Sequence, residues 1–303
     1  MKLTNNLDLN PLIVKVLSHD EYDYNPDIIS ATQIMNPPLM YALKKLHPDD
    51  LERDVSENCA SVFGSAVHAL VETVDLGIEC IKEERLTAKI ELPNGHLYEI
   101  SGKFDLLVKL PNNQWQLIDT KTTSVWTKIY KSHEEDYIHQ LSIYRWLNAL
   151  NGRDVIPDAK IWFWFTDWSR KAANDDPEYP QLRTEIINIK LLSAEETLDY
   201  VVQQLMSKEE AVKLLAEGRE SEIIETDKDL WRKPDVYAVM QEGRKSAVKL
   251  FETEDNAKFY IQEQNLQKAY IDLRKGKVMR CNYCDAWKVC NRYKQFLSEG
   301  LIE

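Results

Sequence analysis

Two turn signals divide one stretch of this chain into three strand-like segments, and this pattern limits what the chain can fold into. The first signal is Asn94-Gly95, the strongest two-residue indication of a β-hairpin. The second is the run from Pro111 to Gln114, whose residue types favour tight turns. The segments that the turns separate are residues 84–92, 97–110 and 115–122. Because these segments are rich in strand-forming apolar residues, the sequence predicts a three-stranded antiparallel meander.

Two aspartates are expected to face each other in this meander. Antiparallel partners about the second turn keep a constant sum of residue numbers, which places Asp105 within about one residue of directly opposite Asp119. Like charges in that arrangement destabilise a sheet by a few tenths to about 1 kcal/mol. Lys121 follows two residues after Asp119 and so lies on the same strand face. We therefore expect a cation, most simply a divalent metal ion, between the two carboxylates.

Two helical motifs flank the aspartates. An Asp/Glu-x-Lys triplet alone carries little weight, because about two such triplets arise by chance in a chain of this length. Gly64 and His68 are four residues apart in a predicted helix, and Gln140 and Tyr144 have the same spacing in the helix predicted after the meander. Residues four apart share one helical face. Four motifs in a fixed order are therefore far more specific than the triplet.

The chain resembles the PD-(D/E)XK nuclease superfamily, specifically its RecB-like exonuclease branch, from about Ser30 to Trp146. The motifs that carry this resemblance are, in order, Gly64-x-x-x-His68, Gly102-x-x-Asp105, Asp119-x-Lys121 and Gln140-x-x-x-Tyr144. The metal ligands that it implies are His68, Asp105, Asp119 and the carbonyl oxygen of Thr120. It also implies that Lys121 positions or activates water, and that Gln140 and Tyr144 contact DNA or order the site.

General chemistry supports these roles. Phosphodiester hydrolysis needs charge to be neutralised on the phosphate and water to lose a proton near neutral pH, and a divalent ion supplies both effects. The oxygen ligands indicate Mg²⁺ or Mn²⁺, and the imidazole of His68 favours Mn²⁺ slightly. Lys121 could hold the attacking water or offset charge on the phosphate. Plainer interpretations remain open for His68, as a histidine of a helix core, and for Tyr144, as a packing residue.

The predicted fold class is α/β, with a restriction-endonuclease-like core in which helices flank a central mixed β-sheet. Further strands are predicted at residues 159–165, which are apolar on both faces and therefore buried, and at residues 183–189. A small inserted ββα module and a C-terminal cysteine-rich segment complete the chain. The expected segments are a lead-in over residues 1–29, the nuclease core over 30–192, an accessory helical region over 193–230, the ββα insert over 231–264, and a C-terminal helix with the cysteine-rich basic segment over 265–303.

The formal net charge of -12 is unusual for a protein that binds DNA, because most such proteins are basic. Residues 274–294 differ from the rest, with seven Lys and Arg against one Asp, a net charge of +6. This composition fits a surface that contacts phosphates, and a solvated charged face would share it. The expected DNA contacts are Arg274, Lys275, Lys277, Arg280, Lys288 and Arg292.

Three cysteines near the C-terminus have the spacing C-x2-C-x5-C, and they are Cys281, Cys284 and Cys290. Related nucleases that hold an iron-sulfur cluster, among them helicase-nuclease subunits and CRISPR-adaptation nucleases, have this spacing and a fourth cysteine far upstream. Asn36 stands where that fourth cysteine would be expected. Because a cluster and a zinc site both usually take four ligands, an iron-sulfur cluster, zinc and a metal-free remnant all stay open. The fourth ligand could come from Cys59, Cys80 or His47.

The cellular setting is expected to be the cytoplasm, or the host cytoplasm if a phage encodes the protein. The chain contains no apolar run approaching the 18 or more residues of a membrane span, so no membrane partner is expected. Five cysteines, an odd number with three crowded at one end, are not typical of a secreted disulfide framework.

These observations predict a metal-dependent DNA nuclease, most simply an exonuclease that acts on DNA ends or single strands in phage or bacterial recombination, replication or repair. The alternatives are a CRISPR-adaptation-type nuclease and a non-catalytic DNA-binding subunit of a helicase-nuclease complex. The sequence lacks a G-x-x-x-x-G-K-[ST] phosphate-binding loop, so any unwinding would come from another protein. The expected partner is DNA, and the candidate protein partners are a recombinase, a single-strand-binding protein or a helicase.

Overall fold

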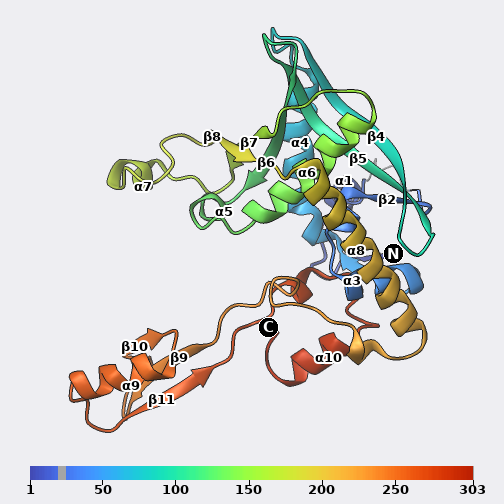
Figure 1. Cartoon of the computed structure of the whole chain (residues 1–303). Coiled ribbons are helices and arrows are strands. Elements are labelled where there is room, and N and C mark those ends of the chain that lie inside the picture. Colours follow the sequence, from blue (N-terminus) through green and yellow to red (C-terminus); the bar gives the residue numbers. More distant parts are fainter. Residues whose placement is uncertain (20–24, 303) are drawn as a thin grey trace. The chain divides into compact units, whose positions relative to one another are not determined.

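The structure, a computed structural model, describes residues 1–19 and 25–302 (Figure 1). Residues 20–24 of the expected lead-in, and residue 303, lie outside the described residues. The chain divides into two compact units. The sheet unit consists of residues 3–36 and 53–207, and the C-terminal unit consists of residues 1–2, 37–52 and 208–303.

A six-stranded mixed β-sheet forms the centre of the sheet unit. Its strands are β2 (Ile28–Ser30), β4 (Cys80–Glu91), β5 (Leu97–Lys109), β6 (Trp115–Thr123), β7 (Asp158–Phe165) and β8 (Thr184–Lys190). β4, β5 and β6 form the predicted antiparallel meander, β7 runs parallel to β6, and β8 pairs antiparallel with β7. The mixed sheet with flanking helices confirms the predicted fold class.

β5 changes partner along its length, and this change shapes the surroundings of the aspartates. Its residues 99–101 pair in parallel with β2, and its residues 106–109 pair antiparallel with β6. The segment Gly102–Asp105 falls between these two ladders, although β4 runs along nearly the whole strand. Side chains from helices and from β6 can therefore meet β5 at this interruption.

Helices pack on both faces of the six-stranded sheet (Figure 1). The helices of the sheet unit are α1 (Pro11–Leu17), α2 (Ala31–Ile34), α4 (Cys59–Thr73), α5 (Val125–Ile129), α6 (Glu134–Leu150) and α7 (Arg170–Asp175), and α8 (Ala194–Ala216) begins in it. α6 packs against β4, β5 and β6, and α4 packs against β6. Ser30 and Gln33 form a capping box that starts α2.

The predicted burial of β7 holds more completely for one face than for the other. Ala159, Ile161, Phe163 and Phe165 are buried, whereas the two tryptophans between them are half-buried. Trp162 donates a hydrogen bond from its indole to Thr184 Oγ1 at 2.8 Å, so its polar edge has a partner on β8. The face that carries Lys160, Trp162 and Trp164 is therefore partly open, contrary to the expected burial of both faces.

The C-terminal unit contains helices and a three-stranded sheet in the order β10-β9-β11. Its elements are α3 (Pro38–Leu46), β9 (Val236–Gln241), β10 (Lys249–Phe251), α9 (Glu254–Glu263), β11 (Ala269–Arg274) and α10 (Asn291–Ser298). β9, β10 and α9 are the strands and the helix expected for the ββα insert. β11 adds a third strand beyond residue 264, because alternating apolar residues at 269, 271 and 273 match the register of β9.

The remaining elements are short. They are β1 (Lys2–Thr4), β3 (Glu52–Asp54) and the 3₁₀ turns at Val55–Asn58, Glu220–Glu222 and Arg280–Tyr283. Among the helices of the described residues, none has both the length and the hydrophobicity needed to cross a membrane.

Candidate active site

Asp105 and Asp119 lie where the β5–β6 ladder ends. The last pair of that ladder is Leu106 with Ile118, so the next positions along are Asp105 and Asp119, as the constant sum of residue numbers requires. Beyond the ladder, the backbone N–H of Thr120 donates to Asp105 Oδ2 at 2.7 Å. Asp119 is 1% exposed and Asp105 is 9% exposed. The meander therefore holds two buried carboxyl groups next to each other.

Lys121 connects Asp119 with α6. Its Nζ lies 2.6 Å from Asp119 Oδ2 and donates a hydrogen bond to Gln140 Oε1 at 3.0 Å. Gln140 Nε2 donates in turn to the hydroxyl of Tyr144 at 2.9 Å. Because Gln140 and Tyr144 occupy successive turns of α6, one helical face extends this chain of contacts. The structure thus brings the aspartate-lysine motif and the glutamine-tyrosine motif together.

Gly102 lets α6 come close to β5. A Cβ atom built on this glycine would lie 2.7 Å and 2.9 Å from two ring carbons of Tyr144, and 2.8 Å from Leu147 Cδ1. Contacts this short do not occur between real side chains, so any larger residue would displace the helix or the ring. The glycine of the Gly102-x-x-Asp105 motif therefore has a packing role beside the site.

His68 reaches the aspartates from α4, and it brings in a residue that sequence reasoning missed. Its Nδ1 lies 3.5 Å from Asp105 Oδ2 and 3.1 Å from Oε1 of Glu83, a residue of β4. The β4–β5 register places Glu83 directly across from Asp105. Partners across the Asn94-Gly95 turn also keep a constant sum of residue numbers, so the sequence could have placed a residue near Glu83 opposite Asp105.

Burial and neighbouring charges set the protonation of these groups. Burial raises the pKa of Asp105 to about 7, and the Asp119 carboxylate adds to that rise. The hydrogen bond to Glu83 raises the pKa of His68 although burial opposes it. Burial alone would lower the pKa of Lys121, but Asp119 and Asp105 raise it above its ordinary value. Near neutral pH Asp105 therefore holds a proton that a bound cation would replace, whereas Lys121 keeps its own proton.

The donor atoms fit a divalent cation. Ligand atoms of His68, Glu83 and Asp105 all lie within 4.8 Å of one another, the one group of this kind found among residues 1–19 and 25–302. Asp119 Oδ2 is buried and, within the same described residues, accepts no well-aligned hydrogen bond despite its ion pair with Lys121. Carboxylate oxygens with one imidazole are ligands suited to Mg²⁺ or Mn²⁺.

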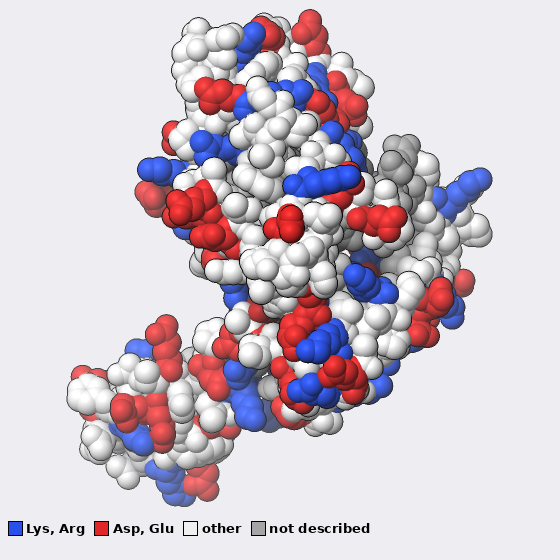
Figure 2. Space-filling view, turned by 45° about the vertical axis from the view of Figure 1, so that its right-hand side comes forward, with Lys and Arg blue, Asp and Glu red and all other residues white. Residues whose placement is uncertain are grey.

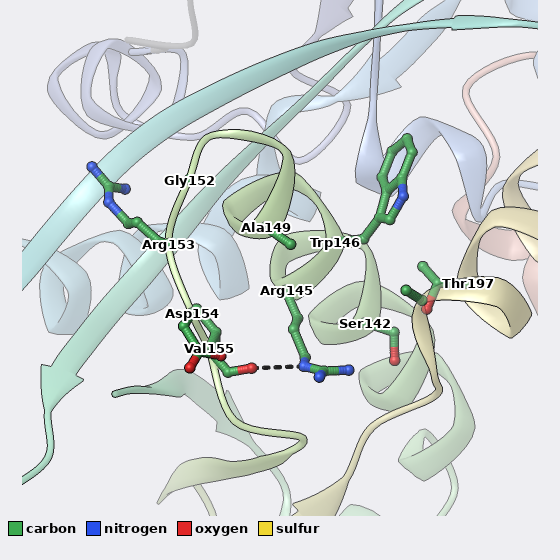
Figure 3. Close-up of a pocket in the computed structure, with 10 residues that line it drawn as sticks. Ser142, Arg145, Trp146, Ala149, Gly152, Arg153, Asp154, Val155 and Thr197 are labelled. Carbon is green, nitrogen blue, oxygen red and sulfur yellow. Dashed lines mark hydrogen bonds between the residues drawn. The ribbon is translucent and has the colours of Figure 1, made fainter. Parts of the chain in front are cut away.

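The opposite face of α6 lines a separate cavity of about 330 Å³ (Figure 3). Ser142, Arg145 and Ala149 project from this face, whereas Gln140 and Tyr144 project toward the aspartates. Arg145 donates from Nε to the carbonyl of Val155 at 2.8 Å and from Nη1 to the carbonyl of Leu192 at 3.3 Å. The cavity contains none of the predicted site residues, and Arg145 fixes α6 to the segments around it.

The three C-terminal cysteines line one cavity of about 30 Å³ in the C-terminal unit, together with Glu225, Arg280 and Arg292. Burial raises the pKa of Cys281 and of Cys290 to about 12, and it also raises the pKa of Cys284. Cys290 Sγ accepts a hydrogen bond from the backbone N–H of Tyr293 and so begins α10. Among the candidate fourth ligands, Cys59 and Cys80 belong to the sheet unit, and His47 lies 3.5 Å from Asp50.

The predicted DNA contacts differ in their surroundings. Arg274 and Lys275 are exposed, Arg274 Nε lies 3.3 Å from Asp272 Oδ2, and Lys277 Nζ donates to the carbonyl of Gly300 at 2.8 Å. The other three have internal partners: Lys288 pairs with Glu52 at 2.6 Å, Arg292 pairs with Glu225 at 2.7 Å, and Arg280 lies 4.2 Å from the centre of the Trp231 ring. On the face shown in Figure 2, basic and acidic side chains of the described residues are intermixed.

Three solved structures resemble the chain at low sequence identity. The crystal structure of SSO0001 is 17% identical, with a TM-score of 0.45, and the match covers 64% of this chain and 84% of that one. A phage-related exonuclease from Haemophilus somnus 129PT is 16% identical, with a TM-score of 0.35 and coverages of 68% and 93%. LHK-Exo, solved in complex with dAMP, is 15% identical, with a TM-score of 0.35 and coverages of 64% and 93%. No curated protein sequence matches the chain.

A model of a protein family matches most of the chain. The model described as the PD-(D/E)XK nuclease superfamily matches residues 74–291, which is more than two thirds of the chain. The matched segment begins after His68 and contains Asp105, Asp119, Lys121 and Gln140. This chain therefore belongs to the PD-(D/E)XK nuclease superfamily.

Proposed function

We propose that the chain is a metal-dependent deoxyribonuclease of the RecB-like branch that acts as an exonuclease on DNA ends or single strands. The observation that carries this proposal is the close grouping of two buried aspartates, one lysine and one histidine at the interruption of the β5 ladder. Phage or bacterial recombination, replication or repair is the setting that we propose, in the cytoplasm and with a recombinase, a single-strand-binding protein or a helicase as partner.

The proposed metal ligands are Asp105, Asp119, His68 and the carbonyl oxygen of Thr120. When bound, Mg²⁺ or Mn²⁺ would supply Lewis-acid stabilisation of the phosphate and a lower pKa for water. The hydrogen bond from Thr120 N–H holds Asp105 Oδ2 in place for that role. The buried Asp119 Oδ2, which accepts no well-aligned hydrogen bond within the described residues, supports its assignment as a ligand.

Lys121 would act as a fixed positive charge. Because the flanking carboxylates raise its pKa, the ammonium stays protonated and can donate hydrogen bonds to water or to a phosphate oxygen. Gln140 accepts one hydrogen bond from this ammonium and donates another to Tyr144. Burial raises the pKa of the Tyr144 phenol, so the phenol keeps its proton. The two residues of α6 thereby fix the direction in which Lys121 points.

The test is digestion of end-labelled linear single-stranded and double-stranded DNA beside covalently closed circles, with Mg²⁺, Mn²⁺ or EDTA. We expect loss of linear DNA with circles spared, and loss of activity in EDTA. Asp119→Ala and Lys121→Ala should each reduce the rate by at least about 100-fold, the usual cost of removing a charge-stabilising group. Asp158→Ala and Lys109→Ala are matched controls, because Asp158 is exposed on β7 and Lys109 pairs with Glu79.

The alternative outcomes are distinct. Cutting of circles would make the protein an endonuclease, and a preference for the ends of short duplexes would favour a CRISPR-adaptation role. If the protein bound DNA but did not cleave it with either Mg²⁺ or Mn²⁺, the enzymatic proposal would be contradicted. That result would support a non-catalytic subunit of a helicase-nuclease complex.

For the three-cysteine cavity, we propose an iron-sulfur cluster, with zinc and a metal-free remnant as the alternatives. The C-x2-C-x5-C spacing and the shared cavity of Cys281, Cys284 and Cys290 support this proposal. Protein purified without oxygen should contain iron and absorb visible light, and Cys284→Ser should lower both signals. Colourless, iron-free and folded protein would contradict the inference.

A further inference from the structure

We propose that Glu83 is an additional metal ligand of the candidate active site, an inference that rests on the metal dependence proposed above. Glu83 belongs to β4, outside the four motifs that suggested the site. In the β4–β5 ladder it stands between the pairs Lys82 with Leu106 and Glu84 with Phe104, and so across from Asp105.

The backbone of Glu83 has an uncommon conformation for a strand residue. Its φ is +49°, in the left-handed region that costs a non-glycine residue about 1–2 kcal/mol. The register of β4 is the same before and after Glu83, so this conformation does not serve to insert an extra residue into the ladder. Local strain of this kind gathers at functional sites, where side-chain placement compensates for it.

The side chain of Glu83 faces two groups of opposite chemical character. Oε1 lies 3.1 Å from His68 Nδ1, and Oε2 lies 2.7 Å from Lys103 Nζ. Burial alone would raise the pKa of Glu83, but the hydrogen bonds with His68 and Lys103 bring the pKa below its ordinary value. Because Asp105 Oδ2 lies 3.5 Å from the same His68 nitrogen, a cation there would meet an imidazole and two carboxylates.

The charges around the site are compatible with a third carboxylate. Lys121 pairs with Asp119, and Lys103 pairs with Glu83. With Asp105 ionised, these three carboxylates and two ammonium groups have a net charge of -1. A divalent ion changes that charge to +1, which matches a single phosphodiester. Without Glu83, the second lysine would have no acidic counterpart in the cluster.

A purely structural role for Glu83 makes a different prediction. The neutral amide of glutamine can still accept hydrogen bonds from Lys103 and His68, so Glu83→Gln would preserve a structural contact. An amide oxygen is a much weaker partner than a carboxylate for a doubly charged ion. Metal affinity therefore separates a ligand from a structural residue, whereas folding stability does not.

The experiment is calorimetric titration of the full chain with Mn²⁺ alone, without DNA, supported by the Mn²⁺ electron paramagnetic resonance signal. Glu83→Gln should raise the dissociation constant for Mn²⁺ by more than about 100-fold, beyond the roughly 10- to 100-fold effect of residues that only support metal ligands. A smaller rise would contradict the role of Glu83 as a ligand and make it a residue that supports His68. Glu84→Gln is the matched control, since it is the same change one residue along, at a side chain that pairs with Arg153. Lys103→Met should bind Mn²⁺ more tightly, because the lysine no longer competes for Glu83.

The outcomes separate the proposed metal dependence from the proposed role of Glu83 as a ligand. If the unmodified chain binds no Mn²⁺, metal dependence fails and the role of Glu83 fails with it. If the chain binds Mn²⁺ and Asp119→Ala abolishes binding, but Glu83→Gln binds like Glu84→Gln, the metal site stands and Glu83 is not a ligand. Unchanged affinity in Lys103→Met would also contradict the proposed competition for Glu83.

Discussion

Gly102→Ala is the substitution whose effect follows most directly from the geometry. The added methyl would lie 2.7 Å from a ring carbon of Tyr144 and 2.8 Å from Leu147 Cδ1, while ordinary contacts begin near 3.4 Å. The ring must therefore move by at least about 0.7 Å, or α6 must move away from β5. Overpacking of this size in a well-packed region costs about 1–3 kcal/mol of folding free energy.

The same displacement should reduce activity. Tyr144 accepts the hydrogen bond from Gln140, which in turn holds Lys121, so movement of the ring is transmitted to the ammonium beside Asp119. A misplacement of about 1 Å at a reacting centre can cost as much as 100-fold in rate. We therefore expect Gly102→Ala to fold with reduced stability and to lose most of its nuclease activity.

Urea unfolding followed by circular dichroism, with nuclease assays on the same samples, measures both effects. Gly64→Ala is the matched control, because it changes the other motif glycine in the same way. A Cβ at Gly64 would lie 3.3 Å from Thr122 Oγ1, a contact that a small shift can relieve, and alanine favours a helix over glycine by about 1 kcal/mol. If Gly102→Ala matched the unmodified chain in both stability and activity, the close approach of α6 to β5 would be refuted.

Three further predictions concern residues around the site. Glu83→Gly should be more stable to urea than Glu83→Ala by about 1 kcal/mol, since both variants lose the carboxylate and only glycine tolerates a φ of +49° without strain; equal stability would contradict the strain. Asp105→Asn, unfolded thermally in EDTA, should be more stable than the unmodified chain at pH 8 by up to a few kcal/mol and equally stable near pH 4. Burial raises the pKa of Asp105 to about 7, so its ionisation destabilises the metal-free fold as pH rises. A stability difference that persists at pH 4 would point to another cause. Arg145→Met should cost about 1–3 kcal/mol in thermal unfolding, because the carbonyls of Val155 and Leu192 lose their donor; an unchanged melting temperature would show that Arg145 does not anchor α6.

The aspartate pair and the mixed sheet were accessible from the sequence because they depend on local rules. Turn chemistry at 94–95 and 111–114 fixes which strands pair, and a constant sum of residue numbers then fixes which residues face each other. Helix starts obey local rules as well, as the capping box of Ser30 and Gln33 at α2 illustrates. These features involve residues that are near in sequence or joined by one short turn.

Tertiary structure decided the features that depend on contacts between distant segments. Gly102 is required because α6 crosses β5 there, and no property of residues 100–104 alone reveals that approach. Glu83 faces His68 through an unusual backbone angle, which strand periodicity does not encode. Arg292 occurs in a basic run typical of a DNA-binding surface, yet it pairs with Glu225, because a charge run in the sequence does not specify which side chains are turned inward. Local patterns thus determined the strands and their pairing, whereas the packing of helices on the sheet decided which polar groups meet at the site.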